Sequence, residues 1–304
     1  MSEAAPQETI PVWRSMLYVP ANNSRFIDKA HTRGADAIIL DLEDSVPASE
    51  RDAARAMLGA SAEKAGQAGA DVVVRVNRPD AETEADLEAA VIPGVRALML
   101  PKVDDASHVR ARADAVQALE TKQGMEAGAI KFIVMIESPA ALLKAAEITA
   151  AHPRIVAAYL GGEDFATAAG MVPDPETLFL PKMMTLFAAR AAGIIPLGMI
   201  GTVADYQDLD AVRDTIRHSR KFGFEGASCI HPSVVPVLNE EMTPSPGEVD
   251  RAHRIVEAYA GAEKEGLGAI TVDGMMIDVP VAERAAALLK RHAAIQIKNN
   301  ALTE

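Results

Sequence analysis

Eight short apolar segments alternate with longer segments rich in Ala, Glu and Arg, and this alternation restricts the fold more than any other feature of the chain. Most of the apolar segments are nearly continuous, which is typical of strands buried on both faces of a parallel sheet. The segments are SMLYVP (15–20), AIILDLED (37–44), DVVVRVN (71–77), ALMLPKV (97–103), KFIVMIES (131–138), IVAAYLGGED (155–164), IIPLGMIG (194–201) and GASCIHP (226–232).

Eight strand–helix units between residues 15 and 232 predict an α/β fold, a (β/α)₈ TIM barrel, for which about 250 residues is typical. An open, doubly wound sheet is the alternative. That fold favours a glycine-rich phosphate loop after the first strand, and VPANNSRF at 19–26 is not such a loop. We therefore predict a barrel at 13–244, preceded by a disordered tail at 1–12.

The remaining residues, 245–304, predict a C-terminal extension. An amphipathic helix at 245–266 is followed by a hairpin at 269–280 that turns at Asp273-Gly274, and then by a last helix. We interpret the extension as a helical and hairpin lid. The alternative is a segment that closes the bottom of the barrel or makes a subunit contact.

Composition excludes several classes of partner. Lys and Arg number 30 against 43 Asp and Glu, a net charge of -13 that repels nucleic acid and anionic lipid. The single cysteine, Cys229, excludes an internal disulfide and fits a reducing compartment. The N-terminus does not resemble a signal peptide, and no apolar run reaches the ~18 residues of a membrane span. We predict a cytoplasmic protein with no nucleic-acid or membrane partner.

Polar and charged residues follow most of the predicted strands, where a TIM barrel places its active site. These residues are Asp41, Glu43, Asp44, Arg75, Asn77, Lys102, Glu137, Ser138, Gly161, Gly162, Glu163, Asp164 and His231. We predict that Lys102, Gly161 and Gly162 contribute to substrate binding.

Glu137 and Asp164 each follow a strand that should be buried, where an unpaired carboxylate is costly. A divalent cation would satisfy both, and Mg²⁺ usually takes one or two protein carboxylates. Mn²⁺ suits the same oxygen ligands. The alternative is that each acid caps a helix or forms a salt bridge. Glu163 should point away from the site, because side chains alternate along an extended chain.

Arg75 lies within VVVRVN, where its guanidinium could bind a carboxylate or a carbonyl oxygen of the substrate. A buried ion pair with Asp41 or Glu43 is the alternative, and the two interpretations are compatible. His231, before Pro232, is more typical of a structural histidine.

Taken in order, the motifs resemble those of the citrate lyase beta-subunit-like branch of the HpcH/HpaI aldolase/citrate lyase superfamily. They are RSMLYVPANNSRF, GADAIILDLEDSV, VRVN, LPKV, IESPAAL, GGEDF and GFEGASCIHPSVV. The resemblance implies a Mg²⁺-dependent lyase that cleaves or forms a C–C bond next to a 2-oxo or 2-hydroxy acid, usually on coenzyme A thioesters.

The resemblance also implies roles for individual residues. Glu137 and Asp164 fall on the metal ligands, and Arg75 falls on the substrate-contacting arginine. Glu43 and Asp44 fall on acids that hold metal-bound water and orient Arg75.

Further roles follow from the same resemblance. Arg25 and Lys29 lie where relatives hold the nucleotide end of coenzyme A. GMMIDVP resembles a segment of stand-alone malyl- and citramalyl-CoA lyases, in which an aspartate, here Asp278, reaches over a neighbouring subunit's site. Relatives of this kind form homotrimers or hexamers.

Two stretches depart from the family pattern. LFLPKMM contains Lys182 where many relatives carry an arginine after Glu176, and the seventh strand has no acid before Asp205. Four functions therefore remain: a lyase acting on citramalyl-CoA or malyl-CoA, a malyl-CoA thioesterase, a metal-dependent aldolase of free 2-oxo acids, and a non-catalytic subunit of a larger lyase.

Overall fold

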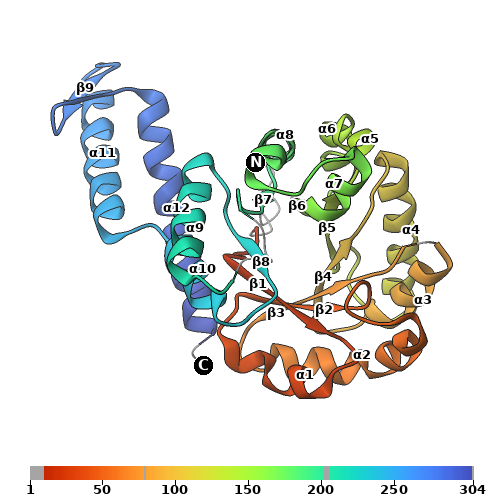
Figure 1. The fold of residues 1–304 in the computed structure, drawn as a ribbon. Helices are drawn as coiled ribbons and strands as arrows, with labels where there is room; N and C mark the ends of the chain where they lie inside the picture. Colours follow the sequence, from red (N-terminus) through yellow and green to blue (C-terminus); the bar gives the residue numbers. More distant parts are fainter. Residues whose placement is uncertain (1–9, 79, 202–205, 303–304) are drawn as a thin grey trace. The chain divides into compact units, whose positions relative to one another are not determined.

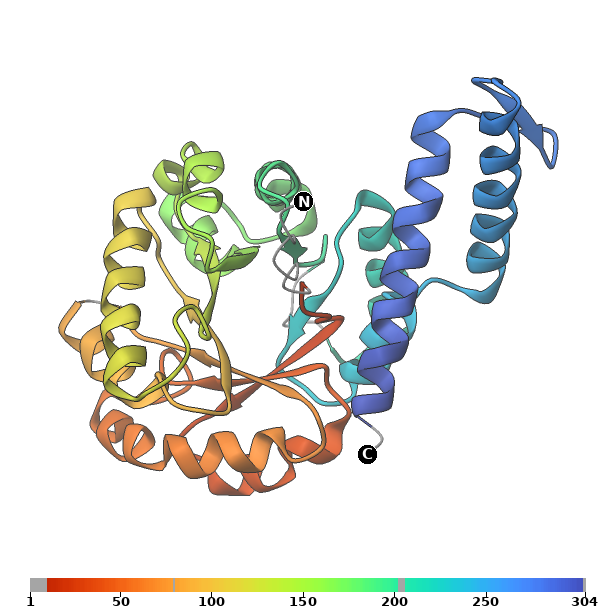
Figure 2. The same ribbon diagram turned by 180° about the vertical axis from the view of Figure 1, so that it is seen from behind.

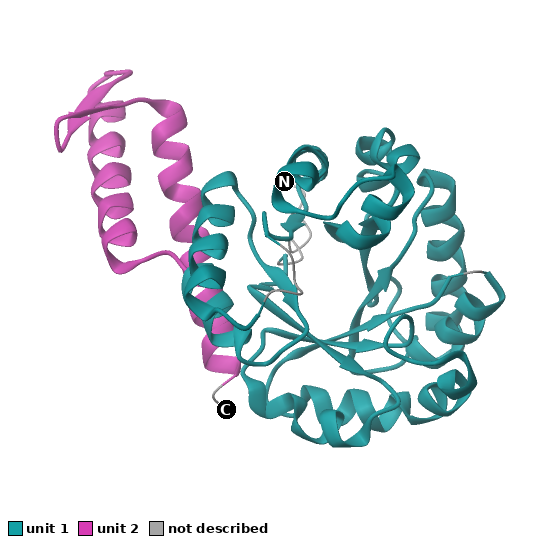
Figure 3. Ribbon diagram, viewed as in Figure 1, with its two compact units in different colours: residues 1–242 teal, residues 243–304 magenta. Residues whose placement is uncertain are grey.

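The computed structural model describes residues 10–78, 80–201 and 206–302. The chain forms two compact units, residues 1–242 and 243–304, which are coloured separately in Figure 3. Residues 1–9 of the predicted tail lie outside the described residues.

The first unit is built on eight parallel strands, and every predicted apolar segment contributes one of them. They are β1 (Ser15–Pro20), β2 (Ala37–Asp41), β3 (Asp71–Arg75), β4 (Val95–Leu100), β5 (Lys131–Ile136), β6 (Ile155–Leu160), β7 (Ile195–Leu197) and β8 (Ala227–Cys229). Neighbours pair in the order β7-β6-β5-β4-β3-β2-β1-β8. A parallel bridge between Leu197 and Gly226 joins the two edges. The (β/α)₈ TIM barrel is confirmed.

Helices follow the strands and surround the sheet, as Figures 1 and 2 show from opposite sides. They are α1 (Ser24–Ala30), η1 (His31–Arg33), η2 (Ala48–Glu50), α2 (Arg51–Gly66), α3 (Asp80–Ala90), α4 (Ala106–Lys122), α5 (Pro139–Leu142), α6 (Ala145–Thr149), α7 (Gly162–Ala169), α8 (Pro175–Ala191), α9 (Leu209–Phe222) and α10 (Val234–Glu241). In the part of the chain that the structure describes, no helix combines the length and apolar character needed to cross a bilayer.

Side chains alternate across the strands and form two apolar layers. Inside the barrel, Met16, Ile39 and Val73 belong to one buried cluster. Between strands and helices, residues such as Leu17 and Ile38 belong to a second, larger cluster. The continuous apolar segments of the sequence are explained because both faces of each strand are covered.

Closure of the barrel depends on a glycine. At Gly226, just before β8, a Cβ atom would lie 1.7 Å from the carbonyl oxygen of Trp13, which precedes β1. Any larger residue would separate the two chain segments. The absence of a side chain therefore allows β8 to pack against β1.

The second unit contains α11 (Pro246–Lys264), a hairpin of β9 (Ile270–Val272) and β10 (Met275–Ile277), and α12 (Val279–Ala301). The hairpin turns at Asp273 and Gly274, with φ angles of 50° and 75°. Positive φ at both central residues is the requirement of a type I′ turn. The predicted helices and hairpin are confirmed, and the role of lid stays a prediction.

Candidate functional site

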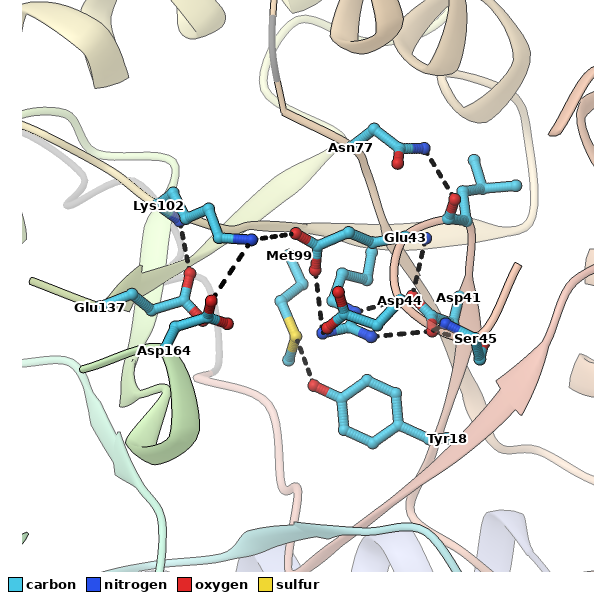
Figure 4. A network of polar contacts seen from close by, with 12 residues as sticks. Tyr18, Asp41, Glu43, Asp44, Ser45, Asn77, Met99, Lys102, Glu137 and Asp164 are labelled. Atoms are coloured by element: carbon cyan, nitrogen blue, oxygen red, sulfur yellow. Dashed lines mark hydrogen bonds and ion pairs between the residues drawn. The ribbon is translucent and has the colours of Figure 1, made fainter. Parts of the chain in front are cut away.

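Seven predicted residues lie at or just after the C-terminal ends of β2 to β6, and we call them the strand-end cluster; Figure 4 labels all of them except Arg75. The cluster consists of Asp41, Glu43, Asp44, Arg75, Lys102, Glu137 and Asp164. Each member forms a hydrogen bond or an ion pair with another member.

Arg75 lies at the end of β3 and contacts three carboxylates. Its Nε and Nη2 atoms donate to the two oxygens of Asp41 at 2.7 and 2.8 Å. Its Nη1 atom lies 3.0 Å from both Glu43 Oε2 and Asp44 Oδ2. The predicted ion pair is present with both Asp41 and Glu43, and it explains how three acids are tolerated at the end of β2.

The pKa values of Asp41 and Glu43 are shifted in opposite directions. Burial alone would raise the pKa of Asp41, but the hydrogen bonds and charge of Arg75 outweigh it, and the pKa is lowered. Burial dominates at Glu43, where it raises the pKa against the opposing effects of Arg75 and Lys102. The bidentate contact therefore fixes Asp41 as the permanent counter-ion of Arg75.

Lys102 links Glu43, which contacts Arg75, to Glu137 and Asp164. Its backbone N–H donates to Glu137 Oε2 at 2.6 Å, and its Nζ atom lies 2.9 Å from Glu43 Oε1 and 3.6 Å from Asp164 Oδ1. Its φ of 50° is a left-handed conformation that is uncommon for a residue other than glycine. Such strain persists only where the surroundings enforce it, and it concentrates at functional sites.

Glu137 follows β5 and is 5% exposed. Burial raises its pKa to about 7; the hydrogen bond from Lys102 opposes the rise, and the nearby charges of Glu43 and Asp164 add to it. Glu137 forms no ion pair with the residues that the structure describes. Of the two predicted alternatives, a salt bridge fits Asp164, which pairs with Lys102, but not Glu137.

The prediction that Glu163 lies in an extended segment is wrong. The chain is not extended there, because α7 begins at Gly162, directly after β6. Glu163 and Asp164 both lie in the first turn of this helix. Glu163 lines a small cavity with Lys182, whereas Asp164 reaches Lys102 in the cluster.

Glu137 and Asp164 fit a divalent cation with oxygen ligands. The Oε1 atom of Glu137 accepts no hydrogen bond from the described residues. Burial is the main cause of the raised pKa of Glu137, and a cation beside this carboxyl group would favour its charged form. No three His, Cys, Asp or Glu side chains in the described ranges could hold a metal by themselves. A pair of carboxylates is nevertheless sufficient for Mg²⁺, which keeps several water ligands.

Gly161 has no space for a side chain, because a Cβ atom there would lie 2.1 Å from Glu137 Oε1. We expect Gly161→Ala to displace the Glu137 carboxylate and to weaken Mg²⁺ binding by about tenfold or more, since the ligand geometry of Mg²⁺ is strict. Titration calorimetry with Mg²⁺ would measure the change. Gly59→Ala on α2 is a suitable control, because a Cβ atom there would make only an ordinary contact, 3.9 Å to Ile92 Cδ1, and the φ of Gly59 is not positive. Equal affinities for Mg²⁺ in all three proteins would contradict the expectation.

Other predicted residues lie around the cluster or outside it. Asn77 is buried and donates to Leu42 O at 2.7 Å, which supports the loop that carries Glu43. Ser138 caps α5. His231 stacks on Tyr206 at 4.8 Å and contacts Ser233, as a structural histidine would.

Gly162 begins α7 and packs against Leu178. Lys182 lies on α8, and its ammonium group donates to Gly201 O at 2.6 Å. Burial lowers the pKa of Lys182 to about 8. The cavity that it lines, of about 40 Å³, includes Gly162 and Glu163.

The predicted coenzyme A residues Arg25 and Lys29 are exposed on α1, one helical turn apart, directly after β1. Asp278 caps α12 in the second unit and accepts from Val281 N at 3.3 Å. Asp205 lies outside the described residues.

Sequence reasoning overlooked Tyr18 and Met99. Tyr18 lies on β1 with its ring 4.9 Å from the guanidinium carbon of Arg75, and its hydroxyl donates to Met99 Sδ at 3.3 Å (Figure 4). The only signal was a phenol within the apolar segment SMLYVP.

Known proteins resemble the chain over nearly its full length. It is 34% identical over 294 residues to the citrate lyase subunit beta of Escherichia coli, which covers 96% of this chain and 97% of that protein. It is 35% identical over 269 residues to a (3S)-malyl-CoA thioesterase of Cereibacter sphaeroides, which covers 88% and 90%.

Solved structures agree with the sequence comparison. The protein CitE from Mycobacterium tuberculosis, in complex with magnesium, acetoacetate and coenzyme A, matches with a TM-score of 0.70 and 28% identity, covering 92% of this chain and 97% of that chain. A citrate lyase beta subunit from the same organism, with oxaloacetate and magnesium, matches with a TM-score of 0.62 and 27% identity, covering 77% and 98%. The family model of the HpcH/HpaI aldolase/citrate lyase family matches residues 14–232, and the chain belongs to this family.

Proposed function

We propose that this protein is a Mg²⁺-dependent carbon–carbon lyase that acts on a 3-hydroxyacyl-CoA such as citramalyl-CoA or malyl-CoA. Cleavage gives pyruvate or glyoxylate and an acyl-CoA, and the reverse reaction forms the same bond. The observation that carries the proposal is the position of the carboxylates of Glu137 and Asp164, which lie at the strand ends beside the Arg75 ion pairs. Two related structures support the choice of substrate and metal: one holds magnesium, acetoacetate and coenzyme A, and the other holds magnesium and the 2-oxo acid oxaloacetate.

Glu137 and Asp164 would hold Mg²⁺, and Mn²⁺ suits the same ligands. The ion would supply Lewis-acid polarisation of the substrate acid and a template for its oxygens. Arg75, held in place by Asp41, would bind the negative charge of the acid half as it develops. Glu43 and Asp44 would hold the Arg75 guanidinium from its other side.

In the cleavage direction, a base takes the proton of the substrate hydroxyl. The electron pair of that O–H bond forms the carbonyl of the 2-oxo acid, and the pair of the breaking C–C bond passes into the thioester enolate. Asp278 would protonate the enolate carbon, and it would remove the same proton in the synthetic direction. Lys102, Gly161 and Gly162 would contact the acid, and Arg25 and Lys29 the nucleotide end of coenzyme A.

If Asp278 acts on the site of a neighbouring subunit, catalysis requires assembly, and we propose a homotrimer or a hexamer of the intact chain. The second unit would then serve as a lid. Analytical ultracentrifugation of the purified protein tests this part of the proposal, and a monomer with full activity would contradict it.

The thioesterase is the second candidate, because one of the relatives carries that name. Aldol cleavage of free 2-oxo acids and a non-catalytic role in a larger lyase complex are further alternatives. The non-catalytic role is kept because of the similarity to citrate lyase subunit beta.

A coupled assay separates these functions. Citramalyl-CoA and malyl-CoA are supplied with Mg²⁺ or with a chelator, while 2-oxo acid and free thiol are followed separately. We expect chelator-sensitive formation of 2-oxo acid without free thiol. Free thiol without 2-oxo acid would indicate the thioesterase. If neither ester reacted, both the lyase and the thioesterase would be contradicted. Turnover of a free 2-oxo acid aldol would then indicate the aldolase.

A further inference from the structure

Tyr18 places a phenol hydroxyl at the base of the strand-end cluster. The residue lies on β1, two positions after Met16, so its side chain points into the barrel. The layer around it is apolar and buried, but Tyr18 itself is only partly buried. A side chain inside a closed barrel reaches solvent only through an open end of the barrel. The strand-end cluster lies at the C-terminal end of this barrel.

The ring of Tyr18 is fixed by Arg75. The guanidinium carbon lies 4.9 Å from the ring centroid, within the range of a cation–π interaction. Arg75 is itself held by two hydrogen bonds to Asp41. The position of the hydroxyl is therefore determined by the same contacts that position the proposed substrate-binding arginine.

The hydroxyl has a poor partner. It donates to the thioether sulfur of Met99 at 3.3 Å, and a thioether is a weak hydrogen-bond acceptor. Met99 pairs with Arg75 across β3 and β4, so this sulfur lies at the level of the guanidinium. In Figure 4 the hydroxyl points toward Met99, on the side of the ring that faces Glu137 and Asp164. A carboxylate or carbonyl oxygen that approached the hydroxyl from that side would be a much stronger acceptor than the thioether.

We propose that the Tyr18 hydroxyl exchanges its contact with Met99 for a hydrogen bond to an oxygen of the bound 2-oxo acid. This inference rests on the proposed function, because it requires an anionic acid between Arg75 and the carboxylate pair. Tyr18 then acts as a neutral hydrogen-bond donor beside the charged guanidinium of Arg75, and it orients the acid for bond cleavage.

Titration calorimetry of the full-length protein with pyruvate in saturating Mg²⁺ tests the proposal. We expect Tyr18→Phe to keep the ring over Arg75 and to raise the Kd for pyruvate about tenfold or more, since hydrogen bonds to charged acceptors are among the stronger ones. The Kd for Mg²⁺ alone should change by less than about twofold, because the phenol does not contact the proposed ligands.

Two further variants separate substrate contact from a structural effect. Met99→Leu removes the sulfur and leaves the hydroxyl free, so the pyruvate Kd should stay near the wild-type value or fall. Tyr159→Phe removes another phenol of the barrel interior, whose oxygen accepts from Ser228 at 3.2 Å, and it should bind pyruvate as the wild type does.

Three results would overturn the proposal. Unchanged pyruvate binding in Tyr18→Phe would exclude the contact. A loss in Met99→Leu or Tyr159→Phe equal to that in Tyr18→Phe would assign the effect to packing of the barrel interior. Absence of Mg²⁺-dependent pyruvate binding in the wild type would contradict the proposed 2-oxo acid site and this inference together, whereas the first two results leave the proposed function intact.

Discussion

Replacement of Arg75 by methionine is expected to lower kcat/KM for cleavage of the CoA thioester by about 10³-fold or more. The guanidinium is the proposed contact of the substrate acid, and Asp41 holds it in a fixed orientation. Methionine keeps much of the length but no charge and no donor. The loss should therefore affect the transition state as well as binding of the acid.

The same replacement should destabilise the fold. Asp41 and Glu43 are 1% and 5% exposed, and both would lose a buried counter-ion. Removing one partner of a buried ion pair typically costs about 3–5 kcal/mol. Urea unfolding of the wild type and the variant measures this cost. Activity assays under conditions in which both proteins are folded separate the loss of activity from unfolding.

Arg55 offers a matched control for Arg75. It also contacts three carboxylates, those of Asp52, Glu82 and Asp86, but it lies on α2 outside the strand-end cluster. Arg55→Met should lower stability while leaving kcat/KM of the folded protein near the wild-type value. If Arg75→Met and Arg55→Met retained equal activity, Arg75 would have no role in the reaction.

Replacement of Glu137 by glutamine is expected to abolish Mg²⁺ binding at millimolar concentration. Glutamine preserves the shape of the side chain but replaces an anionic oxygen ligand with a neutral amide. Titration calorimetry and Mn²⁺ competition measure the loss. Glu163→Gln is the matched control, because Glu163 adjoins Asp164 in the first turn of α7 but faces the cavity with Lys182. A variant Glu137→Gln that bound Mg²⁺ normally would exclude Glu137 as a ligand.

Glu137→Gln should also change how stability depends on pH when metal is removed. The folded protein retains the Glu137 proton up to about pH 7, whereas the unfolded chain releases it near its ordinary pKa of 4.5. The contribution to stability is complete below pH 4.5 and is lost as the pH rises through 7. This difference corresponds to about 3 kcal/mol.

Urea unfolding in chelator at pH 5 and pH 8 measures the effect. The wild type should lose more stability than Glu137→Gln over this interval. The pKa of Glu43 is also raised, but Glu43 is present in both proteins, so the difference isolates Glu137. Identical pH dependence in the two proteins would show that folding does not raise the pKa of Glu137.

The end of β6 illustrates why boundaries are harder to predict than elements. The segment 155–164 predicts a strand running to Asp164, but β6 ends at Leu160 and α7 begins at Gly162. Gly161 is required because a side chain there would meet the Glu137 carboxylate, and acids in a first helical turn are favoured by the helix dipole. The signals were present, but the apolar pattern that defines a strand does not mark where the strand stops.

The sequence by itself indicated the barrel. Nearly continuous apolar strands require a parallel sheet covered on both faces, and the first strand is not followed by the glycine-rich phosphate loop that an open doubly wound sheet favours. It also indicated the edge of the barrel where charged residues gather, since the same ends of parallel strands lie at one edge. The hairpin turn at Asp273-Gly274 was likewise readable from local residue types.

Only the tertiary structure decided how the charges are paired. Arg75 and Asp41 are 34 positions apart, and Lys102 and Glu137 are 35 apart, so their contacts depend on the registers of neighbouring strands. The raised pKa of Glu137 and the position of the Tyr18 hydroxyl arise from burial among these neighbours. Distances and desolvation are properties of the assembled barrel, and no local pattern in the chain encodes them.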